Sequence, residues 1–323
     1  MQIYRFNSIL KPVLWGGDKL LAFKGMPAAC GEPIGESWEL SGMAGRESVV
    51  AQGPDKGLTL TELVQRYGAA LVGKEVYRQH GNRFPLLIKF IDAKRDLSIQ
   101  VHPDDEYAQC HHGEDGKTEL WFILQADEGA KVFTGFKRPM SPEEYDLRVG
   151  DGSILDVVAA NVCRPGDAFF IPAGQIHSIG AGNMLVEIQQ TSDITYRVWD
   201  YGRRDADGNL RQLHTRQARE ALNYNVVDSV VNYGPVAHEG ITPVVECPKF
   251  TLRHIGVDGN FTWTLPENHS FMALVCIAGE VSVTVEEMEP VKLSQGETAL
   301  VPAIAAAIAF GGNARLLAAT VDD

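Results

Sequence analysis

Residues 97–105, LSIQVHPDD, place a glutamine and a histidine two positions apart in a run that otherwise resembles the end of a strand. Successive side chains of a strand point to opposite faces, so Gln100 and His102 are expected on the same face. Both are potential metal ligands, although a lone histidine is more often a surface or hydrogen-bonded core residue. Pro103 follows at once and has no backbone N–H, so the strand is expected to end there.

Two more polar residues lie in strand-like segments further along the chain. Glu119 opens the run ELWFIL, and His177 follows a Pro-Ala-Gly turn by a few residues. Three strands of a small β-barrel would bring these groups together with Gln100 and His102 at one interior spot. Two imidazoles and a carboxylate suit Zn²⁺ and also Mn, Fe, Co or Ni. The sequence therefore predicts a metal site, and ligand positions left to water or substrate would make that site catalytic.

A basic and aromatic segment, TSDITYRVWDYGRR, occupies residues 191–204. A solvated charged loop is the ordinary interpretation of such a run. A guanidinium group, however, matches the geometry of a phosphate, so Arg197 and Arg203 are candidates for contact with an anionic substrate.

Three residues near the predicted ligands are candidates for acid–base chemistry. Lys117 stands two positions before Glu119 and would share its face in a strand. Glu187 alternates with Gln189 in an apolar strand, which predicts that both face inward. Glu187, Asp193 and Lys117 are candidate bases, as is a metal-bound water. The alternative for Glu187 is an outer partner that orients a ligand.

The elements that position these residues are mostly strands, because short apolar runs alternate with Gly- and Pro-rich turns. Residues 59–80 differ, since their apolar residues recur at helical spacing and predict one or two short helices. Further helix candidates are residues 103–112, with Pro103 in the first turn and an exposed pair His111–His112 at the end, residues 141–159, with Ser141 as N-cap, and residues 214–224.

A short internal repeat points to two similar barrels. Residues 166–173, GDAFFIPA, match residues 296–303, GETALVPA. Earlier in each copy, residues 120–126 can be aligned with residues 272–278. The shared form is a turn that feeds a strand into a tight corner, as expected of two antiparallel jelly-roll barrels of the cupin kind. Chance is the alternative for so short a match.

The two copies differ where chemistry would take place. In the alignment of the two copies, His177 corresponds to Ala307 and Glu119 lies near Phe271. The second barrel therefore lacks these two polar residues. We therefore expect a mainly β protein with a catalytic barrel, including short helical insertions, in residues 1–240. Residues 241–323 would form a cupin-like barrel without metal ligands, completed by strands from the N-terminal segment.

Composition narrows the classes of partner. The chain has 323 residues, of which 45% are hydrophobic, and a net charge of -13, so a nucleic-acid partner is not expected. No run approaches the roughly 20 apolar residues of a membrane span, and the N-terminus has no signal sequence. Five widely spaced cysteines without a CxxC pair predict buried thiols in a reducing cytoplasm. No helix shows sustained heptads that would indicate an oligomeric state, and our expectation is a monomer or a weak homo-oligomer.

The motifs LSIQVHPDD, GKTELWFIL, FFIPAGQIHSIG and EIQQTSDITYRVWDYGR occur in this order and at suitable spacings. Together with KPVLWGGDKL, GESWELS and HTRQAREAL, they resemble the type I mannose-6-phosphate isomerases (phosphomannose isomerases), in particular the short bacterial form. The resemblance covers essentially the whole chain and weakens after about residue 240. The long members carry an extra helical domain, and this chain has only a small helical part.

The resemblance implies a zinc-dependent cupin enzyme that interconverts mannose 6-phosphate and fructose 6-phosphate. It assigns one Zn²⁺ per chain to Gln100, His102, Glu119 and His177, and a catalytic role to Arg197, with Lys117 as the lysine before the metal-binding glutamate. Two other classes stay open. A cupin Fe(II) oxygenase also uses two histidines and a carboxylate, and a sugar-phosphate-binding protein can share the fold.

Overall fold

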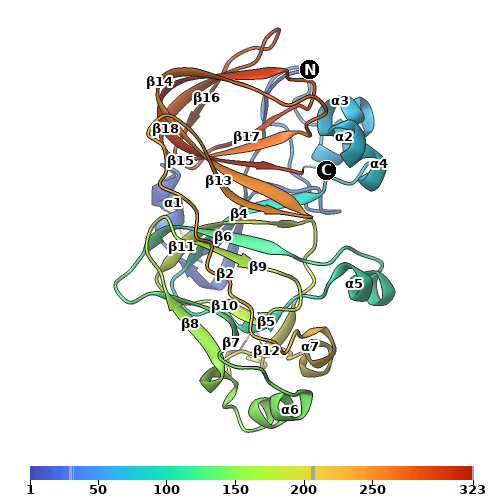
Figure 1. Ribbon diagram of the computed structural model, residues 1–323, viewed down its shortest axis with the longest axis vertical. Coiled ribbons are helices and arrows are strands. Elements are labelled where there is room, and N and C mark those ends of the chain that lie inside the picture. The colour runs from blue at the N-terminus through green and yellow to red at the C-terminus, as the bar shows by residue number, and fades with distance from the viewer. Residues whose placement is uncertain (29–30, 32, 205–207, 322–323) are drawn as a thin grey trace.

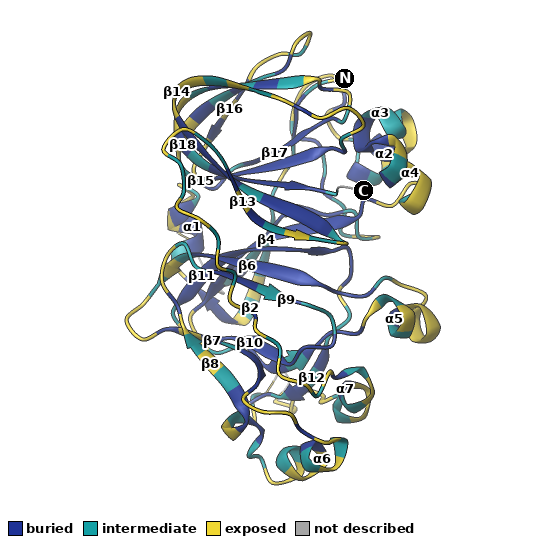
Figure 2. Ribbon diagram, viewed as in Figure 1, coloured by how far each residue is buried: buried dark blue, intermediate teal, exposed yellow. Residues whose placement is uncertain are grey.

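The computed structural model describes residues 1–28, 31, 33–204 and 208–321. Three antiparallel sheets dominate it and lie in two halves along the long axis of the molecule (Figure 1). The prediction of a mainly β, cupin-like fold is confirmed. Figure 2 shows that buried residues follow the strands, whereas the helices on the outside have exposed faces.

The lower half in Figure 1 contains two sheets that face one another. One has the order β12-β5-β10-β7-β8 and the other β2-β3-β4-β11-β6-β9. Their strands are β2 (Ile9–Gly17), β3 (Ile34–Leu40), β4 (Leu86–Ala93), β5 (Ile99–Val101), β6 (Glu119–Ala126), β7 (Lys131–Phe136), β8 (Val158–Val162), β9 (Ala168–Ile171), β10 (His177–Ile179), β11 (Asn183–Gln190) and β12 (Tyr196–Trp199). An apolar cluster that includes Trp15, Trp121 and Val132 draws on strands of both sheets and fills the space between them.

The upper half is a seven-stranded sheet in the order β1-β17-β15-β18-β14-β13, with β16 paired to β15. Its strands are β1 (Tyr4–Arg5), β13 (Gly240–Cys247), β14 (Phe250–Thr264), β15 (Met272–Thr284), β16 (Val291–Ser294), β17 (Thr298–Val301) and β18 (Ala307–Thr320). Because β1 pairs with β17, the N-terminal end of the chain completes the C-terminal sheet. The division of the chain into units at about residue 240 stays a prediction.

The helices are short and lie outside the sheets: α1 (Lys19–Phe23), α2 (Leu60–Tyr67), α3 (Ala69–Val72), α4 (Lys74–His80), α5 (Asp105–His112), α6 (Pro142–Gly150), the 3₁₀ turn η1 (Ile154–Asp156) and α7 (Thr215–Ala221). Residues 59–80 thus form three helices rather than one or two, because Gly68 and Gly73 have positive φ angles that an α-helix does not accept. Pro103 precedes α5 instead of lying in its first turn; Asp104 is the N-cap and accepts from Tyr107 N. Ser141 caps α6 as predicted.

Backbone hydrogen bonds repeat in the two halves and support the internal repeat. Gly166 N donates to Ile123 O at 2.8 Å, and Gly296 N donates to Cys276 O at the same distance. This register makes Ile123 equivalent to Cys276. The equivalence is shifted by one position relative to the sequence alignment of residues 120–126 with residues 272–278. Glu119 therefore corresponds to Met272 rather than to Phe271, since Glu119 pairs with Ile171 and Met272 with Val301.

Four cysteines lie in the described part of the chain, where all are free thiols, and Cys30 lies outside it. Cys163 and Cys276 are buried as predicted, but Cys110 is exposed on α5, where the helix turns one side to solvent. In the same part of the chain, no helix is long and apolar enough to cross a membrane.

Candidate metal and active site

One row of side chains crosses the five-stranded sheet on a single face. Gln100 of β5 pairs with His177 of β10 on one side and with Arg197 of β12 on the other. His177 also pairs with Thr134 of β7. Directly paired residues of an antiparallel sheet point to the same side, so all four belong to one face.

A second row faces it from the six-stranded sheet. Glu187 of β11 pairs with Lys89 of β4 and with Trp121 of β6, while Glu119 pairs with Gln189 two positions along β11. This confirms the predicted alternation of Glu187 and Gln189. Lys89 was missed as a site residue, although a lysine within the buried apolar run PLLIKFIDA was a visible signal.

His102, Glu119 and His177 come together as predicted. One ligand atom from each lies within 4.8 Å of the others, and all three residues are buried. The Nε2 atoms of the two rings are 3.1 Å apart, and Glu119 oxygens lie 3.6 Å from His102 Nε2 and 3.4 Å from His177 Nε2.

Backbone carbonyls fix the two imidazole rings in one tautomer. Nδ1–H of His102 donates to Ile194 O, and that of His177 donates to Gln175 O, each at 2.8 Å. The Nε2 lone pairs therefore face one another. Burial lowers the pKa of His177 to about 4 and that of His102 well below its usual value, so both rings are neutral at pH 7.

The donor set fits a metal ion. Glu119 Oε1 is buried and has no hydrogen-bond partner among the described residues, a costly state that a cation would relieve. Burial and the charge of Glu187 raise the pKa of Glu119, which again indicates missing positive charge. Two neutral imidazoles and one carboxylate are ligands that Zn²⁺ accepts.

Gln100 borders this cluster through its amide. Its Nε2 lies 3.3 Å from His177 Nε2, and its Oε1 accepts from Ser98 Oγ at 3.3 Å. A metal would take the amide oxygen, which a half-turn of the amide group presents at the same place. The structure thus places Gln100 beside the His102–Glu119–His177 cluster.

Lys117 and Glu187 form a charged network against the cluster. Lys117 Nζ donates to Glu119 Oε2 at 2.6 Å and to His102 Nε2 at 3.1 Å, and it lies 3.9 Å from Glu187. Glu187 accepts from Lys89 Nζ and from Trp121 Nε1, each at 3.0 Å. Burial opposes the ionised carboxylate, but the two lysines hold the pKa of Glu187 well below its usual range.

Arg197 lies in the same row as Gln100, but one end of its guanidinium group is bound to a backbone carbonyl away from the cluster. Its Nη1 donates to Gln212 O at 2.8 Å, while its buried Nε has no partner among the described residues. Burial lowers the pKa of this guanidinium. A half-buried cation with an unused donor next to the metal cluster can contact a substrate oxygen.

Other candidates from the basic segment are engaged elsewhere. Arg203 forms an ion pair with Asp200 and donates to Asp96 O, so it is not free for a substrate. Asp193 is exposed and pairs with Arg46 at 2.7 Å, which makes it a poor candidate base. His111 and His112 are exposed, as predicted.

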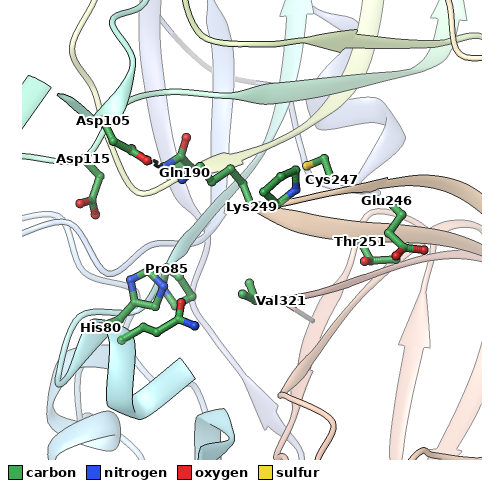
Figure 3. Close-up of a pocket in the computed structure, with 12 residues that line it drawn as sticks. His80, Pro85, Asp105, Asp115, Gln190, Glu246, Cys247, Lys249, Thr251 and Val321 are labelled. Carbon is green, nitrogen blue, oxygen red and sulfur yellow. Dashed lines mark hydrogen bonds and ion pairs between the residues drawn. The ribbon is translucent and has the colours of Figure 1, made fainter. Parts of the chain in front are cut away.

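A hydrogen-bonded chain supports the backbone between Lys117 and Glu119 from outside the barrel. Thr118 N donates to Gln190 Oε1, and Gln190 Nε2 donates to Asp105 Oδ1, each at 2.9 Å. Asp105 also pairs with Lys249 of the C-terminal half. Gln190, Asp105 and Lys249 line a cavity of about 510 Å³ between α4, α5 and the β13–β14 turn (Figure 3). The C-terminal half thus reaches the strand that carries Glu119.

Comparison with known proteins agrees with this geometry. A family model described as "Phosphomannose isomerase type I, catalytic domain" matches residues 3–122, and one described as "Mannose-6-phosphate isomerase, cupin domain" matches residues 240–321. Mannose-6-phosphate isomerase ManA of Bacillus subtilis is 36% identical over 283 residues, which cover 85% of each chain. The chain belongs to the type I phosphomannose isomerase family.

Further relatives extend the family likeness over nearly the whole chain. Mannose-6-phosphate isomerase of Streptococcus mutans is 33% identical over 310 residues, 94% of each chain. The crystal structure of mannose 6-phosphate isomerase from Bacillus subtilis covers 99% of both chains with a TM-score of 0.88 at 31% identity. The resemblance of the sequence motifs to the phosphomannose isomerases is therefore confirmed. It extends to the region after residue 240, where the motifs themselves are weaker.

Proposed function

We propose that this member of the phosphomannose isomerase family is a metal-dependent aldose–ketose isomerase that interconverts D-mannose 6-phosphate and D-fructose 6-phosphate. The observation that carries the proposal is the buried cluster of His102, Glu119 and His177 with Lys117 Nζ 2.6 Å from the Glu119 carboxylate. Family membership supplies the substrate class.

The ligands of the metal would be Gln100, His102, Glu119 and His177, with one Zn²⁺ per chain. When bound, the ion would act as a Lewis acid toward a sugar oxygen. The residues themselves hold its ligands in place, because backbone carbonyls orient both imidazoles and Lys117 orients Glu119.

The reaction moves one proton between C2 and C1 through a cis-enediol. Lys117 and Glu187 lie near enough to the cluster to take part. Both oxygens of Glu187 already accept hydrogen bonds, from Lys89 and Trp121, and its lowered pKa makes it a weak base. We therefore assign the proton transfer to Lys117, which would have to be in its neutral amine form to take the proton, and give Glu187 the role of the anion that positions Lys117 and Lys89.

Arg197 would stabilise the negative charge that develops on the enediolate oxygen. It pairs across the sheet with Gln100, and its buried Nε has no partner among the described residues. A preorganised donor of this kind acts most strongly on charge that appears in the transition state.

The test is a coupled assay for fructose 6-phosphate formed from mannose 6-phosphate. Activity should disappear after chelation and return when Zn²⁺ is added. A zinc-loaded protein without isomerase activity would contradict the proposal and favour the other two classes. Oxygen consumption with Fe²⁺ would identify an oxygenase, and sugar-phosphate binding without turnover would identify a binding protein.

We further propose a cytoplasmic enzyme that is a monomer or a weak homo-oligomer and has no nucleic-acid partner. The net charge of -13 supports the last point. We also retain the division into a catalytic barrel, residues 1–240, and a C-terminal barrel, residues 241–323. Strand register supports the match of Met272 with Glu119, and the sequence repeat supports that of Ala307 with His177.

A further inference from the structure

Three cations gather around the indole ring of Trp38. Lys11 Nζ lies 3.7 Å from the ring centroid, Lys89 Nζ lies 5.0 Å from it, and Arg46 Cζ lies 5.1 Å from it. Each contact is favourable by itself, because the face of an indole carries negative charge. Together they place three like charges on one side chain that is only 1% exposed.

Two of these cations have a carboxylate partner and the third does not. Lys89 pairs with Glu187 and Arg46 with Asp193. Over the ranges that the structure describes, the Lys11 side chain forms no hydrogen bond or ion pair, although Lys11 pairs across the strands with Glu36 of β3. Burial and the nearby Arg46 lower the pKa of Lys11, while the carboxylates of Glu36 and Asp193 partly oppose this shift. The group of Lys11, Arg46 and Trp38, called the Trp38 cluster below, therefore contains one ammonium group with no carboxylate in ion-pair contact, and Glu36 accepts from Trp38 Nε1 at 2.7 Å beside it.

The Trp38 cluster lies on the same sheet face as the metal cluster. Trp38 of β3 pairs with Lys89 of β4, and Lys89 pairs with Glu187 of β11. Neighbouring strands are about 4.8 Å apart, so Trp38 is roughly 10 Å from Glu187 across the sheet. An open-chain hexose phosphate can extend over such a distance. A sugar whose C1–C2 end is at Lys117 would bring its other end to the Trp38 cluster.

The cluster is also reachable from solvent. The side chains of Arg46 and Asp193 are each 40% exposed, and Lys11 is half-buried. An exposed ion pair such as Arg46–Asp193 is weak, so a phosphate dianion can displace the carboxylate.

We propose that Lys11 and Arg46, held on the ring of Trp38, bind the phosphate group of the substrate and set its preference for sugar phosphates over free sugars. This inference rests on the proposed isomerase function. The other arginines fit the phosphate less well. Arg203 is paired with Asp200, and Arg197 stands beside Gln100, at the end of the site where C1 and C2 would react.

The experiment compares Lys11→Met and Arg46→Met with the wild-type enzyme, on mannose 6-phosphate and on free mannose. Loss of a charge-assisted contact should raise the KM for mannose 6-phosphate roughly 10- to 100-fold, with a much smaller change in kcat. The preference for mannose 6-phosphate over mannose should fall by a similar factor. Inorganic phosphate should inhibit the wild type competitively and should inhibit the two variants at least about tenfold less well.

Matched controls remove the same charges elsewhere. Lys56→Met and Arg216→Met alter exposed cations outside the site and should leave KM and kcat unchanged. Lys11→Arg should restore most of the lost affinity, which a merely structural role would not require. Thermal unfolding identifies any variant that fails to fold, and Lys11→Arg then gives the deciding comparison.

The outcomes separate this inference from the proposed function. An unchanged KM in Lys11→Met and Arg46→Met would overturn the inference, and a raised KM in Arg197→Met alone would place the phosphate at Arg197. A wild-type enzyme that turns over neither sugar would instead refute the isomerase function.

Discussion

His102 Nε2 and His177 Nε2 lie 3.1 Å apart, while the Nδ1 of each ring donates to a backbone carbonyl. Two lone pairs at this separation repel one another unless a positive group lies beside them. Lys117 Nζ supplies part of that charge, at 3.1 Å from His102 Nε2. A metal ion held by His102, Glu119 and His177 would supply the rest.

Removal of one imidazole should therefore abolish metal binding. We expect His102→Ala to lower metal affinity by more than about 100-fold and to remove activity. Loss of a residue that only orients a metal ligand lowers affinity by up to about 100-fold, and His102 would be a ligand itself. Elemental analysis after dialysis measures bound metal. His111→Ala changes an exposed histidine and is the control. A His102→Ala protein with one tightly bound metal would disprove the ligand assignment.

Arg197→Ala should separate binding from catalysis. The side chain lies beside Gln100 but is not a ligand, so bound metal should stay at the wild-type level. Loss of a preorganised donor should reduce kcat about 100- to 1,000-fold. Metal analysis and steady-state kinetics on one preparation measure both. Normal turnover by this variant would show that Arg197 does not stabilise the enediolate.

Lys117 and Glu187 can be distinguished by hydrogen exchange with solvent. We expect Lys117→Met to lose turnover and the incorporation of solvent deuterium into product together. Glu187→Gln should be slower but should keep the wild-type ratio of deuterium incorporation to turnover, because Glu187 positions Lys117 from 3.9 Å. Mass spectrometry of the product gives this ratio. If Glu187→Gln alone lost incorporation, the proton carrier would be Glu187.

Gln190 should affect catalysis from outside the barrel. In Gln190→Leu, Thr118 N loses its acceptor, at a cost of about 1–3 kcal/mol in unfolding free energy. Because Thr118 lies between Lys117 and Glu119, kcat should fall roughly tenfold. Gln190→Glu keeps the acceptor for Thr118 N but replaces the donor to Asp105 with a second carboxylate, so it should recover only part of kcat. The control Gln125→Leu changes an exposed position of β6. Equal kcat values for Gln190→Leu and the wild type would refute this role.

His254 should make folding stability depend on pH. Burial lowers its pKa to about 4, whereas the unfolded chain takes up this proton near pH 6.5. Between these values the unfolded state binds more protons, so the unfolding free energy decreases as pH falls, by up to about 1.4 kcal/mol per pH unit. His254→Phe, beside the ring of Phe122, should reduce this slope. Urea unfolding at pH 4.5, 5.5 and 6.5 measures it, and an unchanged slope would contradict the assignment.

The sequence by itself determined those features that depend on local periodicity. A strand has a side-chain period of two, so Gln100 was expected to share a face with His102. In the same way Glu187 was expected to share a face with Gln189, which pairs with Glu119. The motifs identified the family. The repeat of the Gly–acid turn predicted a second, similar barrel, since identical turns impose the same local hydrogen bonds.

Tertiary structure decided everything that depends on which strands become neighbours. Only the register of β6 with β9 and of β15 with β17 equates Glu119 with Met272. Only the pairing of β3 with β4 brings Trp38 beside Lys89, and only packing of the two halves joins Lys249 to Asp105. These contacts join residues far apart in sequence, and local propensity carries no information about them. Arg203 shows the same limit, because its type suited a phosphate but the folded chain pairs it with Asp200.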